Sequence, residues 1–350
     1  MKLLIVTQIL DKNDPVLGFF HEWVREFSKH AEKISVICLK KGVYDLPENV
    51  SVFSLGKETK LAPPFTYMIR LKLLSWKLRR EYDAVLCHMN PEYVIGGALI
   101  WKMFGKKISF WYAHSTVSVR LHLAVALSDI VLTSTDEGLR IKTNKKRIIG
   151  QGIDTEMFSM ISRNPSQTLR LVTVGRISPS KDYETIIAAC SRLSKDAIAY
   201  ELKVIGGPGT SEQQKYFNEI KNKIKILGLS VEVYFVGPLP QNEIIPYLQN
   251  ADVFVSAGLT GSLDKALLEA MSCGAITISC NTAFKNLSTD TLRFSFASKD
   301  SITLEEKIKE VIEMSFSTRI DIGQKMRNIV EKDHSLSNFA EKVIDLIENI

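Results

Sequence analysis

Short apolar runs alternate with longer amphipathic segments along the whole chain. Apolar runs bounded by polar residues are typical of buried parallel strands, whereas apolar residues three and four positions apart are typical of helices. In the first half this pattern predicts strands at 2–7, 34–39, 50–55, 84–88, 107–111, 130–134 and 147–149. Helices are predicted between them at 19–30, 67–81, 93–104 and 118–128.

The same alternation starts again after the polar break Pro165-Ser166-Gln167. Here the pattern predicts strands at 170–174, 201–206, 231–236, 253–256, 275–279 and 293–296. It predicts helices at 183–193, 211–227, 241–251 and 265–273, and a last helix at 336–349 that follows another helical stretch.

Two rounds of strand and helix predict an α/β protein with two doubly wound parallel sheets, that is, two Rossmann-like domains. We expect an N-terminal domain at 1–163, a second domain at 164–334, and a C-terminal helix at 335–350 for which the first domain is a candidate partner. Ligands of such sheets bind beyond the carboxyl ends of the strands, so the loops that follow strands carry the candidate chemistry.

Composition narrows the class of protein. The chain has 45% hydrophobic and 24% charged residues, as ordinary soluble globular proteins do, and its apolar runs are too short to span a membrane. The five cysteines lack C-x-x-C spacing and most lie in apolar runs, which indicates buried free thiols in a reducing compartment. We therefore expect a cytoplasmic protein.

The charge of the chain is uneven. Residues 1–163 contain 24 Lys and Arg against 16 Asp and Glu, a net charge of +8, and residues 164–350 contain 21 against 23, a net charge of −2. Part of the excess lies on a predicted helix, at 70–72 and 76–80. Such a face suits anionic lipid, nucleic acid or an acidic substrate, or it is an ordinary solvated helix. No nucleic-acid-binding motif accompanies it, so we expect no nucleic-acid partner.

In the second half, the loop after the strand at 170–174 contains two cations. Gly175 permits a close turn, and Arg176 and Lys181 suit phosphate contacts, with Ser180 or Asp182 as the cap of the next helix. Surface cations beside an ordinary strand–helix turn are the alternative.

Two further loops are weaker candidates. Gly207, in the run Gly-Gly-Pro-Gly at 206–209, suits either a phosphate loop or a tight turn. Val236, Pro238 and Leu239 border a turn whose exposed backbone could flank a planar base, although a plain turn explains it equally well.

The sequence GSLDKALLEAMSCG, at 261–274, follows the strand at 253–256 and opens a helix that Gly274 is placed to end. The backbone at Gly261, Ser262 and Leu263 together with the helix start makes an anion site. Glu269 would reach ribose hydroxyls beside that anion, or it forms a solvated surface pair with Lys265, four residues earlier. Two cations, an anion-binding helix start and a carboxylate together indicate a nucleotide-diphosphate site.

The first half contains three polar loops at one edge of its predicted sheet. We expect these loops to face the second half, which contains the predicted nucleotide site, across an interdomain cleft. Gly18 ends the loop after the first strand, Asn90 and Glu92 follow the strand at 84–88, and His114 follows the strand at 107–111. A single histidine in this position is either catalytic or structural.

These segments resemble the retaining glycosyltransferases of family 4, which have the GT-B fold. The resemblance covers nearly the whole chain. Its most specific parts are VGRISPSKDYETII (174–187), ADVFVSAGLTGSLDKALLEAMSCGAITIS (251–279), WYAHS (111–115) and GQGIDTEMF (150–158).

The resemblance implies roles for individual residues. Arg176 and Lys181 would bind the donor diphosphate, Glu269 the donor ribose and His114 the donor sugar, while Gly18 would lie near the diphosphate and acceptor. It also implies a metal-independent enzyme that uses no cofactor besides its nucleotide-sugar co-substrate.

One departure from the family pattern concerns the E-x7-E element, whose first carboxylate is replaced here by Gly261. We expect Asp264 to replace it on the sugar hydroxyls and Lys265 to neutralise Asp264 or the phosphate. The alternative is that Asp264 only caps the helix.

The sequence thus predicts a retaining, hexosyltransferase-type glycosyltransferase. Its partners would be a nucleotide diphosphate-sugar donor and a glycan or lipid-linked acceptor, in surface polysaccharide or glycolipid synthesis, with peripheral contact to an anionic membrane. The rival hypotheses are a sugar-nucleotide epimerase or a phosphorylase on the same fold and a nucleotide-sugar-binding protein without turnover.

Overall fold

The computed structural model describes residues 1–59, 62–259 and 263–350, and it divides into two compact units. Unit 1 comprises Met1–Gly152 and Leu336–Ile350, and unit 2 comprises Ile153–Ser335. The division lies ahead of the polar break at 165–167, because Ile153 and Phe158 pack into the hydrophobic core of unit 2.

Unit 1 contains one parallel sheet of seven strands in the order β3-β2-β1-β4-β5-β6-β7. The strands are β1 (Lys2–Leu10), β2 (Lys33–Lys41), β3 (Val50–Ser54), β4 (Ala84–His88), β5 (Lys107–Trp111), β6 (Ile130–Thr133) and β7 (Lys146–Ile148). The helices are α1 (Phe19–His30), α2 (Pro64–Lys77), α3 (Pro91–Met103), α4 (Val119–Leu127) and α13 (Leu336–Glu348).

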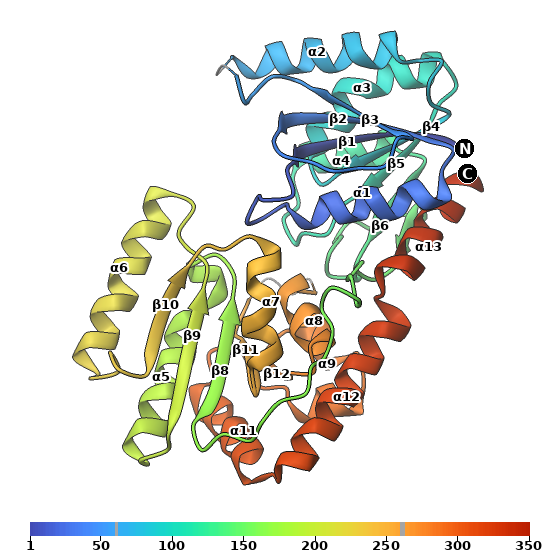
Figure 1. Cartoon of the computed structure of the whole chain (residues 1–350). Helices are drawn as coiled ribbons and strands as arrows, with labels where there is room; N and C mark the ends of the chain where they lie inside the picture. Colours follow the sequence, from blue (N-terminus) through green and yellow to red (C-terminus); the bar gives the residue numbers. More distant parts are fainter. Residues whose placement is uncertain (60–61, 260–262) are drawn as a thin grey trace. The chain divides into compact units, whose positions relative to one another are not determined.

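The alternating side chains of β1 divide the core of unit 1 into two layers. Leu3 and Ile5 pack with α1 and α13, whereas Leu4 and Val6 pack with α2, α3 and α4 on the other face of the sheet. The C-terminal helix therefore completes the layer begun by α1, as Figure 1 shows. Both faces of the sheet are covered, which explains why its central strands β1, β4, β5 and β6 are largely apolar.

Unit 2 contains a five-stranded parallel sheet in the order β10-β9-β8-β11-β12. The strands are β8 (Leu169–Val174), β9 (Tyr200–Ile205), β10 (Val233–Gly237), β11 (Val253–Ser256) and β12 (Ile276–Ser279). A short 3₁₀ helix, η1 (Pro179–Lys181), follows β8. The α-helices are α5 (Tyr183–Lys195), α6 (Ser211–Ile226), α7 (Gln241–Asn250), α8 (Lys265–Ser272), α9 (Thr282–Lys285), α10 (Thr289–Arg293), α11 (Ser301–Glu313) and α12 (Phe316–Asp333).

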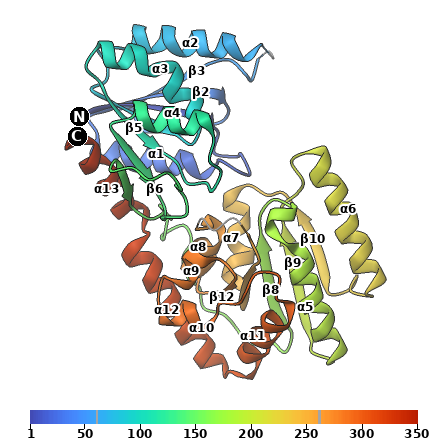
Figure 2. The ribbon, with the colours of Figure 1, turned by 180° about the vertical axis from the view of Figure 1, so that it is seen from behind.

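The helices of unit 2 form two packed groups. Helix α5 packs against α6 and α11, and α8 packs against α7 and α12; Figure 2 gives the view of these groups from behind. The α/β fold with two parallel sheets is confirmed. The strand predicted at 293–296 is wrong: α10 occupies Thr289–Arg293, and only an isolated bridge joins Ser279 to Ser295.

All five cysteines are free thiols, and four of them are buried. Burial raises the pKa of the Cys38, Cys190 and Cys273 thiols to about 12. Within the described residues, no helix is both long enough and apolar enough to cross a membrane.

Candidate functional site

The strand order of unit 2 places two candidate loops side by side. Strand β8 lies at the centre of the sheet, with β9 and β10 on one side and β11 and β12 on the other. The strand order therefore reverses between the parallel neighbours β8 and β11, and this switch point is where parallel α/β sheets bind ligands. The loop after β8 and the loop after β11 meet there, where the backbone N–H of Leu259 donates to the carbonyl of Ser180 at 2.9 Å.

Glycines end three adjacent strands at this edge of the sheet. Gly175, Gly206 and Gly237 have φ angles of +153°, +135° and +93°, which disfavour any residue with a side chain. A Cβ atom on Gly206 would lie 2.0 Å from the carbonyl oxygen of Gly175, so the two backbones approach too closely for any other residue.

The two weaker loop candidates belong to the same edge. The carbonyl of Gly207 accepts a hydrogen bond from the N–H of Ile177 at 3.1 Å, so Gly207 takes part in a backbone turn. Pro238 is exposed, whereas Val236 and Leu239 are half-buried against the core.

Lys181 and Asp264 form an ion pair between the two switch-point loops. Both side chains are mostly buried. The lysine reaches Asp264 across Gly175, whose missing side chain leaves room: a Cβ there would lie 3.1 Å from the Lys181 Cε. Asp264 holds the N-cap position of α8 but accepts no helix N–H, so the capping alternative is wrong for its side chain. Asp182, not Ser180, caps α5 by accepting from the N–H of Thr185.

Glu269 and Lys265 form a second ion pair, with 3.1 Å between Lys265 Nζ and Glu269 Oε1. The expected pairing of Lys265 with Asp264 is therefore wrong. The pair is not solvated as the alternative required, because both side chains are largely buried. Glu269 also accepts from the Gln241 Nε2 at 2.7 Å. The sequence predicted no role for Gln241, whose one distinguishing feature is its position directly after the loop that follows β10.

Arg176 differs from these charged neighbours. Its side chain is exposed, and it makes no hydrogen bond or ion pair with any residue of the described ranges. The switch point therefore presents one unneutralised guanidinium beside two cations that already have carboxylate partners. Leu263 is buried next to these pairs, whereas Gly261 and Ser262 lie outside the described residues.

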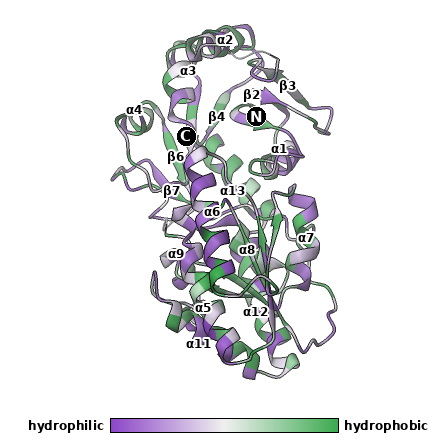
Figure 3. Cartoon of the chain, turned by 90° about the vertical axis from the view of Figure 1, so that its left-hand side faces the viewer, coloured by the Kyte–Doolittle hydropathy of each residue, from purple (hydrophilic) through white to green (hydrophobic). Residues whose placement is uncertain are grey.

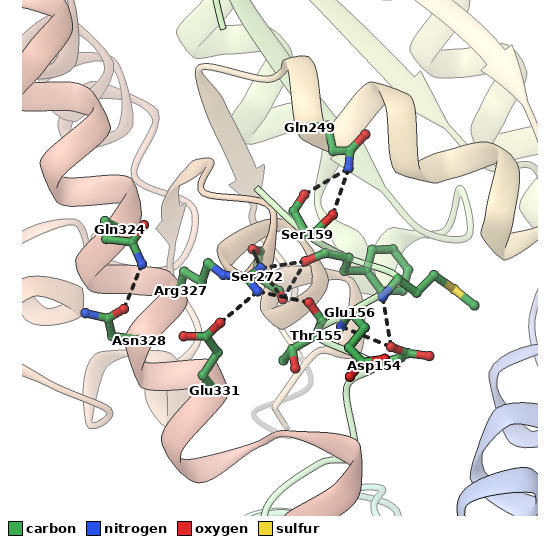
Figure 4. A network of polar contacts seen from close by, with 12 residues as sticks. Asp154, Thr155, Glu156, Ser159, Gln249, Ser272, Gln324, Arg327, Asn328 and Glu331 are labelled. Carbon is green, nitrogen blue, oxygen red and sulfur yellow. Dashed lines mark hydrogen bonds and ion pairs between the residues drawn. The ribbon is translucent and has the colours of Figure 1, made fainter. Parts of the chain in front are cut away.

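Arg327 of α12 donates to Ser272, the last residue of α8 (Figure 4), and α8 is the helix that carries Glu269. Its guanidinium donates to the carbonyls of Phe158, Thr155 and Ser272, at 3.0, 3.0 and 2.5 Å. Because the last carbonyls of a helix have no partner within the helix, the bond to Ser272 satisfies one of them. Glu331 pairs with the same guanidinium at 2.7 Å. Gly274 has a φ of +76° and ends the helix as predicted.

The candidates of unit 1 lie at that unit's own switch point, between β1 and β4. Gly18 occupies the N-cap position of α1, and a Cβ on it would lie 2.6 Å from the Asp14 carbonyl oxygen. The Asn90 Nδ2 contacts Gln8 of β1 at 3.5 Å. Beneath them His88 is buried and stacked on Phe20, with ring centroids 4.1 Å apart, and burial lowers the pKa of its imidazole to about 3.

His114 and Glu92 complete the predicted set. The Nδ1 of His114 accepts the N–H of Thr116 at 3.1 Å, so the proton of the neutral ring lies on Nε2. Glu92 forms an exposed ion pair with Arg120 at 2.9 Å. His114, Asn90 and Glu92 all belong to unit 1, whereas the phosphate and ribose candidates all belong to unit 2.

A pocket and a metal-binding cluster are the two alternatives to this candidate site. A pocket of about 370 Å³ in unit 2 is lined by Arg170, Glu201, Lys203 and residues of α7, and none of the predicted site residues lines it. No group of three or more His, Cys, Asp and Glu that could hold a metal ion occurs in the described parts of the chain.

Solved structures define the class of fold. Alr3699/HepE of Anabaena, in complex with UDP and glucose, matches all of this chain with all of its own, with a TM-score of 0.79 and 15% sequence identity. Sucrose-phosphate synthase of Thermosynechococcus elongatus matches all of this chain with 99% of its own, with a TM-score of 0.82 and 15% identity. The chain thus has the two-domain GT-B fold that its sequence predicted.

The family follows from the sequence itself. The model of the family Glycosyl transferases group 1 matches residues 154–348, which is more than half of the chain. The chain belongs to this family, and the resemblance drawn from its motifs is confirmed.

Curated relatives match over shorter stretches. The amylovoran biosynthesis glycosyltransferase AmsK of Erwinia amylovora is 32% identical over 142 residues, which are 39% of this chain and 33% of that protein. The putative colanic acid biosynthesis glycosyltransferase WcaL of Salmonella typhimurium is 26% identical over 136 residues, 37% of this chain and 32% of that protein. The matched region therefore spans about a third of the length of these relatives.

Proposed function

We propose that this protein is a retaining glycosyltransferase that moves a sugar from a nucleotide diphosphate-sugar to an acceptor hydroxyl. The observation that carries the proposal is the switch point of unit 2. There Arg176 has no hydrogen-bond or ion-pair partner among the described residues, Lys181 belongs to the same loop, and a buried carboxylate, Glu269, lies on α8, the helix that follows β11. This unit lies within the region matched by the family model.

In this proposal the cations stabilise the charge that develops on the leaving diphosphate. Arg176 supplies a bidentate donor, and Lys181 exchanges Asp264 for the diphosphate when the donor binds. The released Asp264 then accepts hydrogen bonds from hydroxyls of the donor sugar. Glu269, held by Lys265 and Gln241, accepts from the ribose hydroxyls. The backbone around Gly175, Gly207 and Val236–Leu239 borders the nucleoside.

The reaction exchanges one bond at the anomeric carbon for another on the same face of the sugar. The bond to the diphosphate oxygen breaks, the bond to the acceptor oxygen forms, and the acceptor proton passes to the leaving phosphate. His114 donates from Nε2 to the donor sugar, a role that fits the tautomer set by Thr116. No metal or cofactor takes part in this scheme.

The acceptor in this proposal is a glycan or lipid-linked sugar, as in surface polysaccharide or glycolipid synthesis, bound at the cytoplasmic face of a membrane. Two relatives, AmsK and WcaL, are named for amylovoran and colanic acid biosynthesis, which supports a role in polysaccharide assembly. Asn90, Glu92 and the loop that ends at Gly18 would contact the acceptor. The excess of cations in residues 1–163 favours an anionic acceptor.

Binding of the donor is tested first. A calorimetric screen of nucleoside diphosphates and their sugars should find a ligand, and Glu269→Gln should weaken its binding at least about tenfold, the loss of one charge-assisted hydrogen bond. The control Glu306→Gln, on an exposed position of α11, should bind like the wild type. A wild-type protein that binds no member of the screen would contradict the proposal.

Turnover is tested next with Arg176→Ala. Because Arg176 is exposed and forms no hydrogen bond or ion pair with the described residues, the variant should keep its melting temperature. Its kcat/KM should fall about 100-fold, while the exposed Arg192→Ala should stay near the wild-type value. Near-normal turnover of Arg176→Ala would remove Arg176 from the reaction.

Product analysis separates the rivals. A transferase releases free nucleoside diphosphate and forms a glycoside, an epimerase returns an altered nucleotide sugar, and a phosphorylase requires inorganic phosphate. A binding protein without turnover would bind donor and release nothing.

A further inference from the structure

Helix α2 is apolar on two opposite faces, although only one of them is covered. Leu71 and Ser75 are buried, and Met68 packs so closely on α3 that a Cβ on Gly96 would overlap its sulfur. The opposite face carries the large exposed residues Phe65, Ile69, Leu73 and Trp76. A surface helix normally buries its apolar residues against the core, so a second, exposed apolar face requires an explanation.

The exposed residues form a continuous stripe. They follow one another at intervals of four, four and three positions, which keeps them on one side of a helix. Their side chains are 65, 51, 63 and 47% exposed, respectively. On the adjacent helix α3, Leu99 and Met103 are exposed as well. Single exposed apolar residues are common on proteins, but an aligned stripe of this size marks a binding surface.

The charges around the stripe are all of one sign. Residues 62–80 contain five Lys and Arg and no Asp or Glu. Lys72, Lys77 and Arg80 are exposed, and the Arg79 guanidinium lies 4.8 Å from the centre of the Trp76 ring. Figure 3 shows hydrophobic residues interleaved with hydrophilic ones on α2. This helix has the composition of one that lies flat in a membrane interface, with an apolar side and basic flanks.

We propose that the stripe Phe65, Ile69, Leu73 and Trp76 docks unit 1 on a bilayer that contains anionic lipid. The apolar side chains enter the boundary between headgroups and acyl chains, and Lys72, Lys77, Arg79 and Arg80 meet lipid phosphates. A second copy of this chain fits less well, because a symmetric interface would bring two clusters of cations together without a counter-charge. The inference does not depend on the proposed enzymatic activity.

Trp76 provides a direct probe of docking. The other three tryptophans, Trp23, Trp101 and Trp111, are buried, so a change of emission on adding vesicles reports on Trp76. The full chain is mixed with vesicles of phosphatidylcholine alone, or with about a third phosphatidylglycerol. The anionic vesicles should shift the tryptophan emission to the blue and carry the protein upward in a flotation gradient. Neutral vesicles should bind at least about tenfold less protein in both assays. Trp76→Phe should float without the spectral shift.

Two pairs of variants separate the apolar and electrostatic parts. Ile69→Ser with Leu73→Ser should reduce flotation about tenfold, as should Lys72→Glu with Lys77→Glu. The matched controls in unit 2 are Ile226→Ser with Val231→Ser, and Lys215→Glu with Lys225→Glu, all at exposed positions. These controls should float like the wild type. Raised salt should weaken vesicle binding by the wild type and by every variant that keeps Lys72 and Lys77.

Three results would overturn the proposal. The wild type could fail to float with anionic vesicles at low salt, or the α2 variants could float as well as the controls. Light scattering could also show a dimer that the Ile69 and Leu73 substitutions dissociate, which would assign the stripe to a second copy. None of these readouts involves sugar transfer, so failure here leaves the proposed activity untouched.

Discussion

At the scale of single residues, the central feature is that two cations of the switch point already have carboxylate partners. The sequence predicted Lys181, Asp264, Lys265 and Glu269 as site residues and offered the Lys265–Glu269 pair as an alternative, but it did not predict the pair of Lys181 with Asp264. Neighbours along the chain suggested a pair of Asp264 with Lys265, whereas the structure pairs Asp264 with Lys181, from the loop after a different strand. Such a pairing depends on which strands lie side by side, which spacing along the sequence does not reveal.

The first prediction for a single residue follows from the Lys181–Asp264 pair. Asp264→Asn removes the internal competitor for Lys181, so a nucleoside diphosphate should bind about tenfold more tightly, equivalent to about 1.4 kcal/mol. Discrimination between donor sugars should decrease, because the carboxylate proposed to bind sugar hydroxyls is gone. Calorimetry with a nucleoside diphosphate and with several of its sugars measures both effects.

Asp321→Asn, at an exposed position of α12, is the control for this substitution. An unchanged donor profile in Asp264→Asn, accompanied only by a lower melting temperature, would show that Asp264 serves stability alone.

His88 makes a second residue-scale prediction, on pH. Burial lowers the pKa of His88 to about 3, against about 6.5 in the unfolded chain, so the unfolded state binds the extra proton first as the pH falls. The stability that the neutral ring provides is complete above about pH 6.5 and is lost below it. From about pH 7.5 to about pH 5 the loss should be about 2 kcal/mol.

Chemical denaturation at several pH values measures this effect. His88→Gln should show a smaller fall in the free energy of unfolding between these pH values than the wild type, and the exposed His122→Gln should behave like the wild type. An equal pH dependence in His88→Gln and the wild type would mean that His88 is protonated in the folded protein.

At the scale of elements, the apolar periodicity predicted the strands of both sheets and most of the long helices, but it gave no helix at α9, α10 or α11. It succeeded where strands lie in the middle of a sheet covered on both faces, because such strands are short, largely apolar runs that differ clearly from the helices. It failed at 293–296, where the apolar residues Phe294 and Phe296 are buried beyond the end of α10 rather than in a strand. A short apolar run shows that a segment is buried, but not which backbone conformation it has.

The position of α8 depends on a residue that the sequence did not indicate. Arg327→Met removes hydrogen bonds to three carbonyls from two separate segments, and the free energy of unfolding should fall by about 2–4 kcal/mol. Because α8 carries Glu269, binding of the nucleoside diphosphate should weaken as well. Urea denaturation and calorimetry measure the two effects.

Lys325→Met, exposed on the same helix, is the matched control and should be neutral. If Arg327→Met unfolds as the wild type does, the network around Ser272 does not hold α8 in place.

At the scale of the whole molecule, the sequence predicted two parallel-sheet domains but left the partner of the last helix open. Helix α13 packs on α1 through Phe339, whose ring centroid lies 4.3 Å from that of Trp23. The periodicity of residues 336–349 predicts an apolar face on this helix. It does not indicate which surface covers that face, because other predicted helices and sheets of the chain also have apolar faces. The tight contact at Gly152, where a Cβ would lie 2.7 Å from Phe339, was equally invisible in the sequence.

A single reaction followed by NMR distinguishes retaining sugar transfer from the other reactions of a nucleotide sugar. The purified full chain is incubated with the donor found by calorimetry and with lipid and polysaccharide extracts as acceptors. The proposal predicts that free nucleoside diphosphate appears at the same rate as a glycoside that keeps the anomeric configuration of the donor. With Arg176→Ala both products should form about 100-fold more slowly. Inversion of that configuration, or conversion of the donor without release of nucleoside diphosphate, would contradict it.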